Sequence, residues 1–82
     1  MDEETRSAEQ LAQDYTAMGH SVDLINGIID GTKMVDESDE EKQDTVRRNK
    51  EHLEIMVAKE DWGSEDMTSA NSAIESATTY LG

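Results

Sequence analysis

The scarcity of large apolar side chains constrains the fold of this 82-residue chain more than any other feature. The chain contains four leucines, five isoleucines and four valines, and it has no phenylalanine. Because small domains bury only about 60% of the surface that their unfolded chains expose, such a core must be thin. Cysteine is absent, so neither a disulfide nor a thiolate metal site reinforces it. We therefore expect stability to come partly from self-association or from a protein partner.

The charge of the chain excludes several partner classes. Twenty acidic and seven basic residues give a formal net charge of −13, which repels nucleic-acid phosphates and anionic lipids. No apolar run approaches the roughly 20 residues that a membrane span needs. The acidic residues 2–4 are unlike the basic start of a signal peptide. We therefore predict an intracellular protein with no direct nucleic-acid or membrane contact.

Apolar residues of the first 31 positions recur at helical spacing. They predict one helix over about 3–18 with Gly19 just beyond its end, and a second over 22–30 with Ser21 as its cap and Gly31 as its terminator. A single kinked helix over both ranges is the alternative. Within the second range, Gly27 costs up to about 1 kcal/mol relative to Ala, which the close approach of a neighbouring helix or of a partner would offset.

Two further helices are expected in the second half of the chain. Ser38 and Glu41 have the spacing of a capping box, which starts a helix over about 39–60 that we expect to be the spine of the fold. The last helix, about 65–80, has Ser64 or Thr68 as its cap. Its apolar residues follow alternating spacings of three and four, typical of a packing seam: Met67, Ala70, Ile74, Ala77 and Leu81.

Together these patterns predict the all-α class. Residues 1–82 should form a single helical domain of three to four short helices, arranged as a small antiparallel helical bundle or as a helical-hairpin assembly.

The sequence offers little on which catalysis or metal binding could rest. Neither His20 nor His52 has a histidine partner at zinc-site spacing. A calcium loop starting at Asp36 would place Glu41 where glycine is needed and Arg47 where a bidentate glutamate is needed. Phosphate-binding and nucleophile-elbow motifs are also missing. We predict a protein that is not an enzyme, with no catalytic, cofactor-binding or metal-ligating residues.

Six residues are candidates for an interface: Arg47, Arg48, Trp62, Met67, Ala70 and Ile74. Arginine and tryptophan are enriched where proteins meet, and the other three are seam positions on the last helix. Each candidate also has a structural interpretation. The arginines sit four residues from acidic partners and suit intrahelical ion pairs of about 0.2–0.5 kcal/mol each, and a lone tryptophan at a helix junction is usually a core residue.

Three stretches carry a resemblance to a known group of proteins. They are residues 22–31 (VDLINGIIDG), residues 48–56 (RNKEHLEIM) and residues 59–62 (KEDW). Over roughly 15–75 the chain resembles small acidic helical proteins that tailed bacteriophages and prophages encode. The resemblance implies a phage context, in the host cytoplasm or in the virion, and assigns no site residues.

Two functions of different classes follow as hypotheses. The leading one is a non-enzymatic protein-interaction or virion-structural accessory protein, acting through helix faces in an oligomer or a larger assembly. The alternative is an acidic host-directed inhibitor that imitates nucleic acid in a basic groove of a host enzyme. The acidic residues cluster at 2–4, 36–44 and 60–66, largely at predicted helix starts, where carboxylates favour the helix dipole. This clustering favours the first hypothesis.

Overall fold

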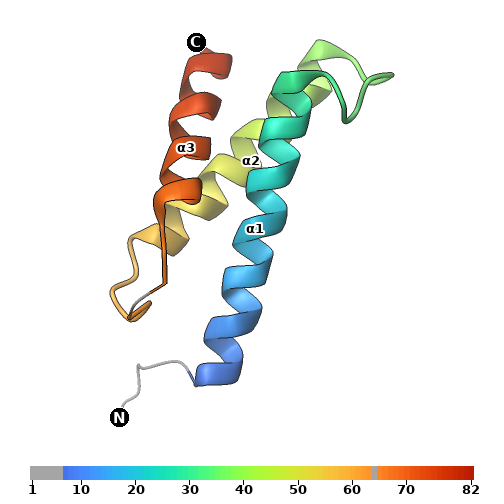
Figure 1. Ribbon diagram of the computed structural model, residues 1–82. Coiled ribbons are helices and arrows are strands. Elements are labelled where there is room, and N and C mark those ends of the chain that lie inside the picture. Colours follow the sequence, from blue (N-terminus) through green and yellow to red (C-terminus); the bar gives the residue numbers. More distant parts are fainter. Residues whose placement is uncertain (1–6, 64) are drawn as a thin grey trace.

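The computed structural model describes residues 7–63 and 65–82. Within these ranges the chain forms three helices and no strand: α1 (Ala8–Asp30), α2 (Asp39–Val57) and α3 (Thr68–Leu81). The predicted all-α class is confirmed for this part of the chain. In Figure 1, α1 rises from the N-terminal end, α2 descends behind it, and α3 rises again beside α1. Every pair of helices is in contact.

The first helix corrects the predicted break at Gly19. Ser7 caps α1, its hydroxyl accepting a hydrogen bond from the Gln10 N–H at 3.1 Å, and the helix then continues without interruption to Asp30. Gly19 keeps a right-handed helical backbone, and Ser21 is an interior residue rather than a cap. The reason is an apolar stripe that runs through Gly19 at alternating spacings of four and three: Leu11, Tyr15, Met18, Val22, Ile25 and Ile29. Positions 3–6 of the predicted helix lie outside the described residues.

The end of α1 follows the prediction at Gly31. Gly31 adopts the left-handed conformation with φ of 83°, and its N–H donates to the carbonyl groups of Gly27 and Ile28. The Gly27 carbonyl also accepts from the N–H groups of Thr32 and Lys33. A Cβ on Gly27 would lie 2.6 Å from two Lys33 side-chain carbons. The close neighbour of Gly27 is therefore the loop after α1, not another helix.

The second helix begins where its capping residue predicts. The Ser38 hydroxyl accepts a hydrogen bond from the Glu41 N–H at 3.2 Å. The helix ends at Val57, three residues before the expected position 60, so the 23-residue α1 rather than the 19-residue α2 is the longest helix. The end is fixed by Trp62, whose Nε1–H donates to the Met56 carbonyl at 2.7 Å in place of a further helical turn.

The third helix starts later than predicted. Met67 occupies the N-cap position, and its side chain makes no capping hydrogen bond. Thr68 is therefore the first helical residue rather than the cap, and its N–H donates to the Asp66 carboxylate at 2.9 Å. Of the other predicted cap and start positions, Ser64 lies outside the described residues and Glu65 precedes the helix. The helix ends at Leu81, one residue beyond the expected end.

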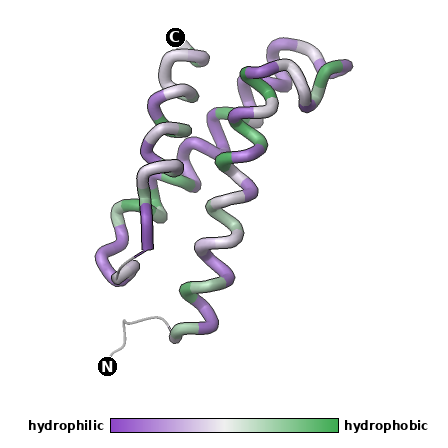
Figure 2. The backbone as a smooth tube through the Cα atoms, viewed as in Figure 1, coloured by the Kyte–Doolittle hydropathy of each residue, from purple (hydrophilic) through white to green (hydrophobic). Residues whose placement is uncertain are grey.

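One thin hydrophobic core joins the three helices. Its buried members come from each helix and from the α2–α3 loop: Met18, Ile25, Ile28, Val46, Leu53, Trp62, Ala70, Ala73 and Ala77. α3 contributes only alanines to this set, which lets its backbone approach its neighbours closely. Figure 2 shows hydrophobic and hydrophilic positions interleaved along α1 and α2, with no long apolar run. None of the described helices combines the length and apolarity that a membrane crossing requires.

Candidate functional site

A groove lies along the seam between α1 and α3. It encloses about 230 Å³, and we call it the α1–α3 groove. Five of the lining residues belong to α1, and three lie at or just before the start of α3: Tyr15, Met18, Gly19, Val22, Asp23, Asp66, Ser69 and Ala70. The two helices run in the same direction at this face, with α2 behind them (Figure 1). None of the residues that line the groove belongs to α2.

Small residues make this groove possible. A Cβ built on Gly19 would meet no heavy atom within 4 Å, so the missing side chain leaves real space at the surface of α1. Across the groove, Ser69 and Ala70 are equally short. Met18 and Ala70 are buried and form its apolar floor, whereas Asp23 and Asp66 are exposed at its rim. The arrangement is a narrow apolar channel with a carboxylate on each helix side.

An aromatic pair, Tyr15 and Trp62, lies at the end of the groove nearest the N-terminus of α1. The Tyr15 hydroxyl donates to the Asp66 backbone carbonyl at 2.8 Å and joins α1 to the start of α3. The Tyr15 ring also contacts Trp62 edge-on, with 6.1 Å between ring centroids. Since Trp62 in turn donates to Met56, this corner ties all three helices together. The hydrogen bond from Tyr15 thus fixes the Asp66 backbone relative to α1, and the contact of Tyr15 with Trp62 fixes this corner relative to the end of α2.

Among the titratable groups that the structure describes, the Asp66 carboxyl has a clearly perturbed pKa. Hydrogen bonds from the Thr68 side chain, which has the larger effect, and from the Thr68 backbone N–H lower the pKa of this exposed carboxyl below its ordinary value of 3.8. The group remains ionised at neutral pH. It therefore contributes a full negative charge to the rim, close to the N-terminus of α3, where it accepts a hydrogen bond from the Thr68 N–H.

Charge is segregated between the helices. α1 contains Glu9, Asp14, Asp23 and Asp30, and α3 contains Glu75, while neither helix contains a lysine or an arginine. Four cations lie on α2, namely Lys42, Arg47, Arg48 and Lys50. The lining of the α1–α3 groove contains two carboxylates, Asp23 and Asp66, and no lysine or arginine.

A second, shallower hollow follows the same seam near the other end of α3. It encloses about 360 Å³ and is lined by Ile29 of α1 and by four residues of α3: Glu75, Ser76, Thr79 and Tyr80. Ile29 is 39% exposed, although it belongs to the apolar stripe of α1. Both ends of the α1–α3 seam therefore present apolar groups to solvent.

The six interface candidates are not brought together. Trp62 and Ala70 are buried in the core, and Met67 and Ile74 are half-buried against it. Arg47 and Arg48 are exposed on α2 and line a separate open hollow together with Met34 and acidic residues. Of the six, Ala70 lines the α1–α3 groove. Trp62 lies in the core, where its ring contacts Tyr15.

The two arginines make intrahelical ion pairs. Arg48 pairs with Asp44 four residues earlier, as its spacing predicts, and Lys50 pairs with Glu54 at 3.1 Å. The acidic residue four positions from Arg47 is Glu51, but the Arg47 guanidinium lies 3.4 Å from Asp44 instead. Because Asp44 already holds both arginines, their structural interpretation is supported by geometry.

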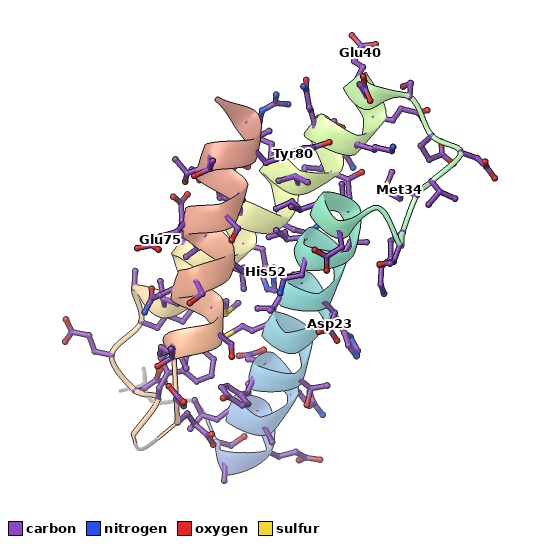
Figure 3. The ribbon with its side chains drawn as sticks, turned by 45° about the horizontal axis from the view of Figure 1, so that its top comes forward. Asp23, Met34, Glu40, His52, Glu75 and Tyr80 are labelled. Carbon is purple, nitrogen blue, oxygen red and sulfur yellow. The ribbon has the colours of Figure 1, made fainter. Side chains whose placement is uncertain are left out.

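Ser21 and His52 form a polar contact between α1 and α2. The Ser21 Oγ lies 2.9 Å from the His52 Nδ1, and His52 projects from α2 toward α1 (Figure 3). A serine beside a histidine resembles a nucleophile with its base. However, Ser21 is only 5% exposed, and neither residue lines the α1–α3 groove. The pair therefore serves as an interhelical hydrogen bond.

Metal binding finds no support in the part of the chain that the structure describes, where no group of three or more His, Asp or Glu side chains is arranged to hold an ion.

Sequence reasoning missed Gly19 and Asp23 as site residues. The missed signal was the unbroken stripe through Gly19, which makes this glycine a gap on a helix surface instead of a helix end.

Comparison with known proteins identifies no relative. No protein-family model matches the chain, and no curated protein or solved structure is significantly similar to it.

Proposed function

We propose that the chain is a non-enzymatic protein-interaction subunit: an antiparallel helical bundle that acts through its helix faces in an oligomer or a larger assembly. The observation that carries this proposal is the α1–α3 seam, which is apolar at its floor and open along one face. A groove between two helices is a common receptor for a helix of another protein. The thin core supports the same proposal, because a bound partner would add the apolar burial that the chain lacks.

The resemblance to small acidic phage proteins suggests the setting. In that setting the chain would be an accessory component of a virion or of its assembly, present in the host cytoplasm or in the particle. Arg47, Arg48, Met67 and Ile74 remain interface candidates at its periphery, since each is at least partly exposed.

One observation favours a second candidate, an acidic inhibitor that imitates nucleic acid. The α1 and α3 helices carry five acidic residues and no lysine or arginine. A nucleic-acid surrogate, however, needs regularly spaced charges, whereas here an apolar floor separates Asp23 from Asp66. A surrogate would lose its partner at about 1 M salt, where charges are screened beyond roughly 3 Å, while an apolar contact would persist.

Native mass spectrometry combined with sedimentation of the full chain tests the proposal. We expect oligomers at micromolar concentration, or co-sedimentation of the chain with assembled particles purified from an infected or induced host. A chain that stays monomeric at all concentrations and is absent from the particles would contradict it.

A further inference from the structure

We propose that the α1–α3 groove receives a basic amphipathic helix from a partner protein, with apolar side chains on its floor and Lys or Arg side chains against Asp23 and Asp66. This inference rests on the proposed interaction function and specifies the chemistry of the partner. The groove is defined by geometry, and the partner by what would complement it.

Charge complementarity selects a basic occupant. The groove has a carboxylate from the α1 side and one from the α3 start, and no cation lies on either helix. Asp23 makes no ion pair with any residue that the structure describes. A second copy of the chain is a poor occupant, because it brings a further charge of −13 to an acidic face.

Shape selects a helix with a small number of apolar anchors. α1 and α3 run side by side (Figure 1), and residues of both helices line the two hollows on their seam, so a rod-shaped partner lying along the seam would contact both hollows. The volume of about 230 Å³ is below the range of about 300–1,000 Å³ typical of small-molecule pockets, and suits inserted side chains instead. The 14 residues of α3 span about 21 Å, so a partner helix of three to four turns would cover the seam.

The missing side chain at Gly19 permits a sharp test. Gly19→Leu places a large side chain in the groove from α1, at a helical position where a Cβ meets no heavy atom within 4 Å. Leucine also favours the helix more than glycine does. Ala17→Leu is the matched control, because Ala17 is an exposed α1 residue outside the groove. Asp23→Lys reverses a rim charge, and Glu51→Lys reverses an exposed charge on α2 as its control.

The experiment is a fluorescence-anisotropy titration of the full chain with a labelled synthetic helix of about 14 residues that has leucine on one face and lysine on the other. A peptide of the same composition in scrambled order is the second probe. Far-UV circular dichroism and thermal melting confirm that each variant is folded. We expect the wild type to prefer the amphipathic peptide, and both Gly19→Leu and Asp23→Lys to weaken binding about tenfold or more relative to their controls.

Two outcomes would overturn the inference. Equal weakening by Asp23→Lys and Glu51→Lys, with no effect of Gly19→Leu, would mean general attraction to an acidic chain. Undiminished binding by folded Gly19→Leu would place the peptide elsewhere. Either result leaves the association measured by native mass spectrometry unchanged, so failure of this inference is distinguishable from failure of the proposed function.

Discussion

The Tyr15 ring lies edge-on to the Trp62 indole, with ring centroids 6.1 Å apart and ring planes inclined at 60°. Tyr15 belongs to α1, whereas Trp62 follows α2 and is 7% exposed. Through its hydroxyl, Tyr15 also reaches the Asp66 carbonyl before α3 begins. One aromatic pair therefore positions the acidic rim of the α1–α3 groove relative to its floor.

We expect Tyr15→Phe to lower the free energy of unfolding by about 0.5–1 kcal/mol, because it removes the hydrogen bond to Asp66 and keeps the ring contact. Urea denaturation followed by the fluorescence of Trp62, the single tryptophan, measures the change. Tyr80→Phe is the matched control, since within the described residues no hydrogen bond of the Tyr80 hydroxyl occurs. An equal effect of the two substitutions would contradict a specific role for the Tyr15 hydroxyl.

Ser21→Ala should destabilise the chain by about 1 kcal/mol, because Ser21 is buried and its loss leaves His52 without its partner on α1. Replacing both partners, as in Ser21→Ala with His52→Leu, removes the unpaired polar group. We expect the double variant to lose less stability than the sum of the two single variants. Chemical denaturation of all four proteins measures this coupling, and additive losses would mean that the contact carries no energy.

The two glycines inside α1 should respond differently to alanine. Gly19→Ala is expected to stabilise the chain by about 0.5–1 kcal/mol, since its Cβ meets open space in a helix interior. Gly27→Ala should give no such gain, because its Cβ would press on the Lys33 side chain. Thermal unfolding compares the two variants. If Lys33 is the cause, adding Lys33→Ala to Gly27→Ala restores the gain, and a failure to restore it would contradict this explanation.

Asp66 predicts a pH dependence of stability. Its pKa is lowered in the folded chain by hydrogen bonds from the Thr68 side chain, which has the larger effect, and from the Thr68 backbone N–H. A carboxyl with a lowered folded pKa stabilises the fold above its unfolded value, near 3.8, and this stabilisation is lost as the pH falls through the folded value. The melting-temperature difference between wild type and Asp66→Asn should therefore shrink on acidification below about pH 4.

The control for this measurement is Glu65→Gln, which removes a neighbouring charge from the same loop but leaves the contact between Asp66 and Thr68. The acid-dependent difference should persist in a Glu65→Gln background. A wild-type advantage over Asp66→Asn that stays constant from neutral pH to about pH 2 would show that ionisation of Asp66 makes no contribution to stability.

Local signals in the sequence were sufficient to predict several elements of the fold. Ser38 and Gly31 act through their own backbone neighbourhood, so a cap and a left-handed terminator could be predicted without tertiary information. Gly19 could not be assigned from its identity alone, because glycine marks helix ends and helix surfaces alike. What decides between them is the packing of α1 as a whole, and the apolar stripe across Gly19 is its trace in the sequence.

The candidate site was predictable only in part. Trp62 and Ala70 were interface candidates that also had a structural interpretation as packing residues, and the structure places both in the core. The groove itself depends on two helices that are distant in sequence lying side by side. The apolar stripe across Gly19 indicates a helix surface at this position but does not show which helix lies beside it. Charge segregation was partly visible, since five of the seven cations fall between positions 42 and 59.

The most direct test of the central claim, that the chain acts through its α1–α3 face, is amide chemical-shift mapping by NMR during titration with the leucine–lysine helix. We predict shifts concentrated at the groove, above all at Gly19, Asp23 and Ala70, with little change around Arg48 and Ile55 on α2. Shifts centred on α2, or spread evenly over all acidic residues, would contradict the claim.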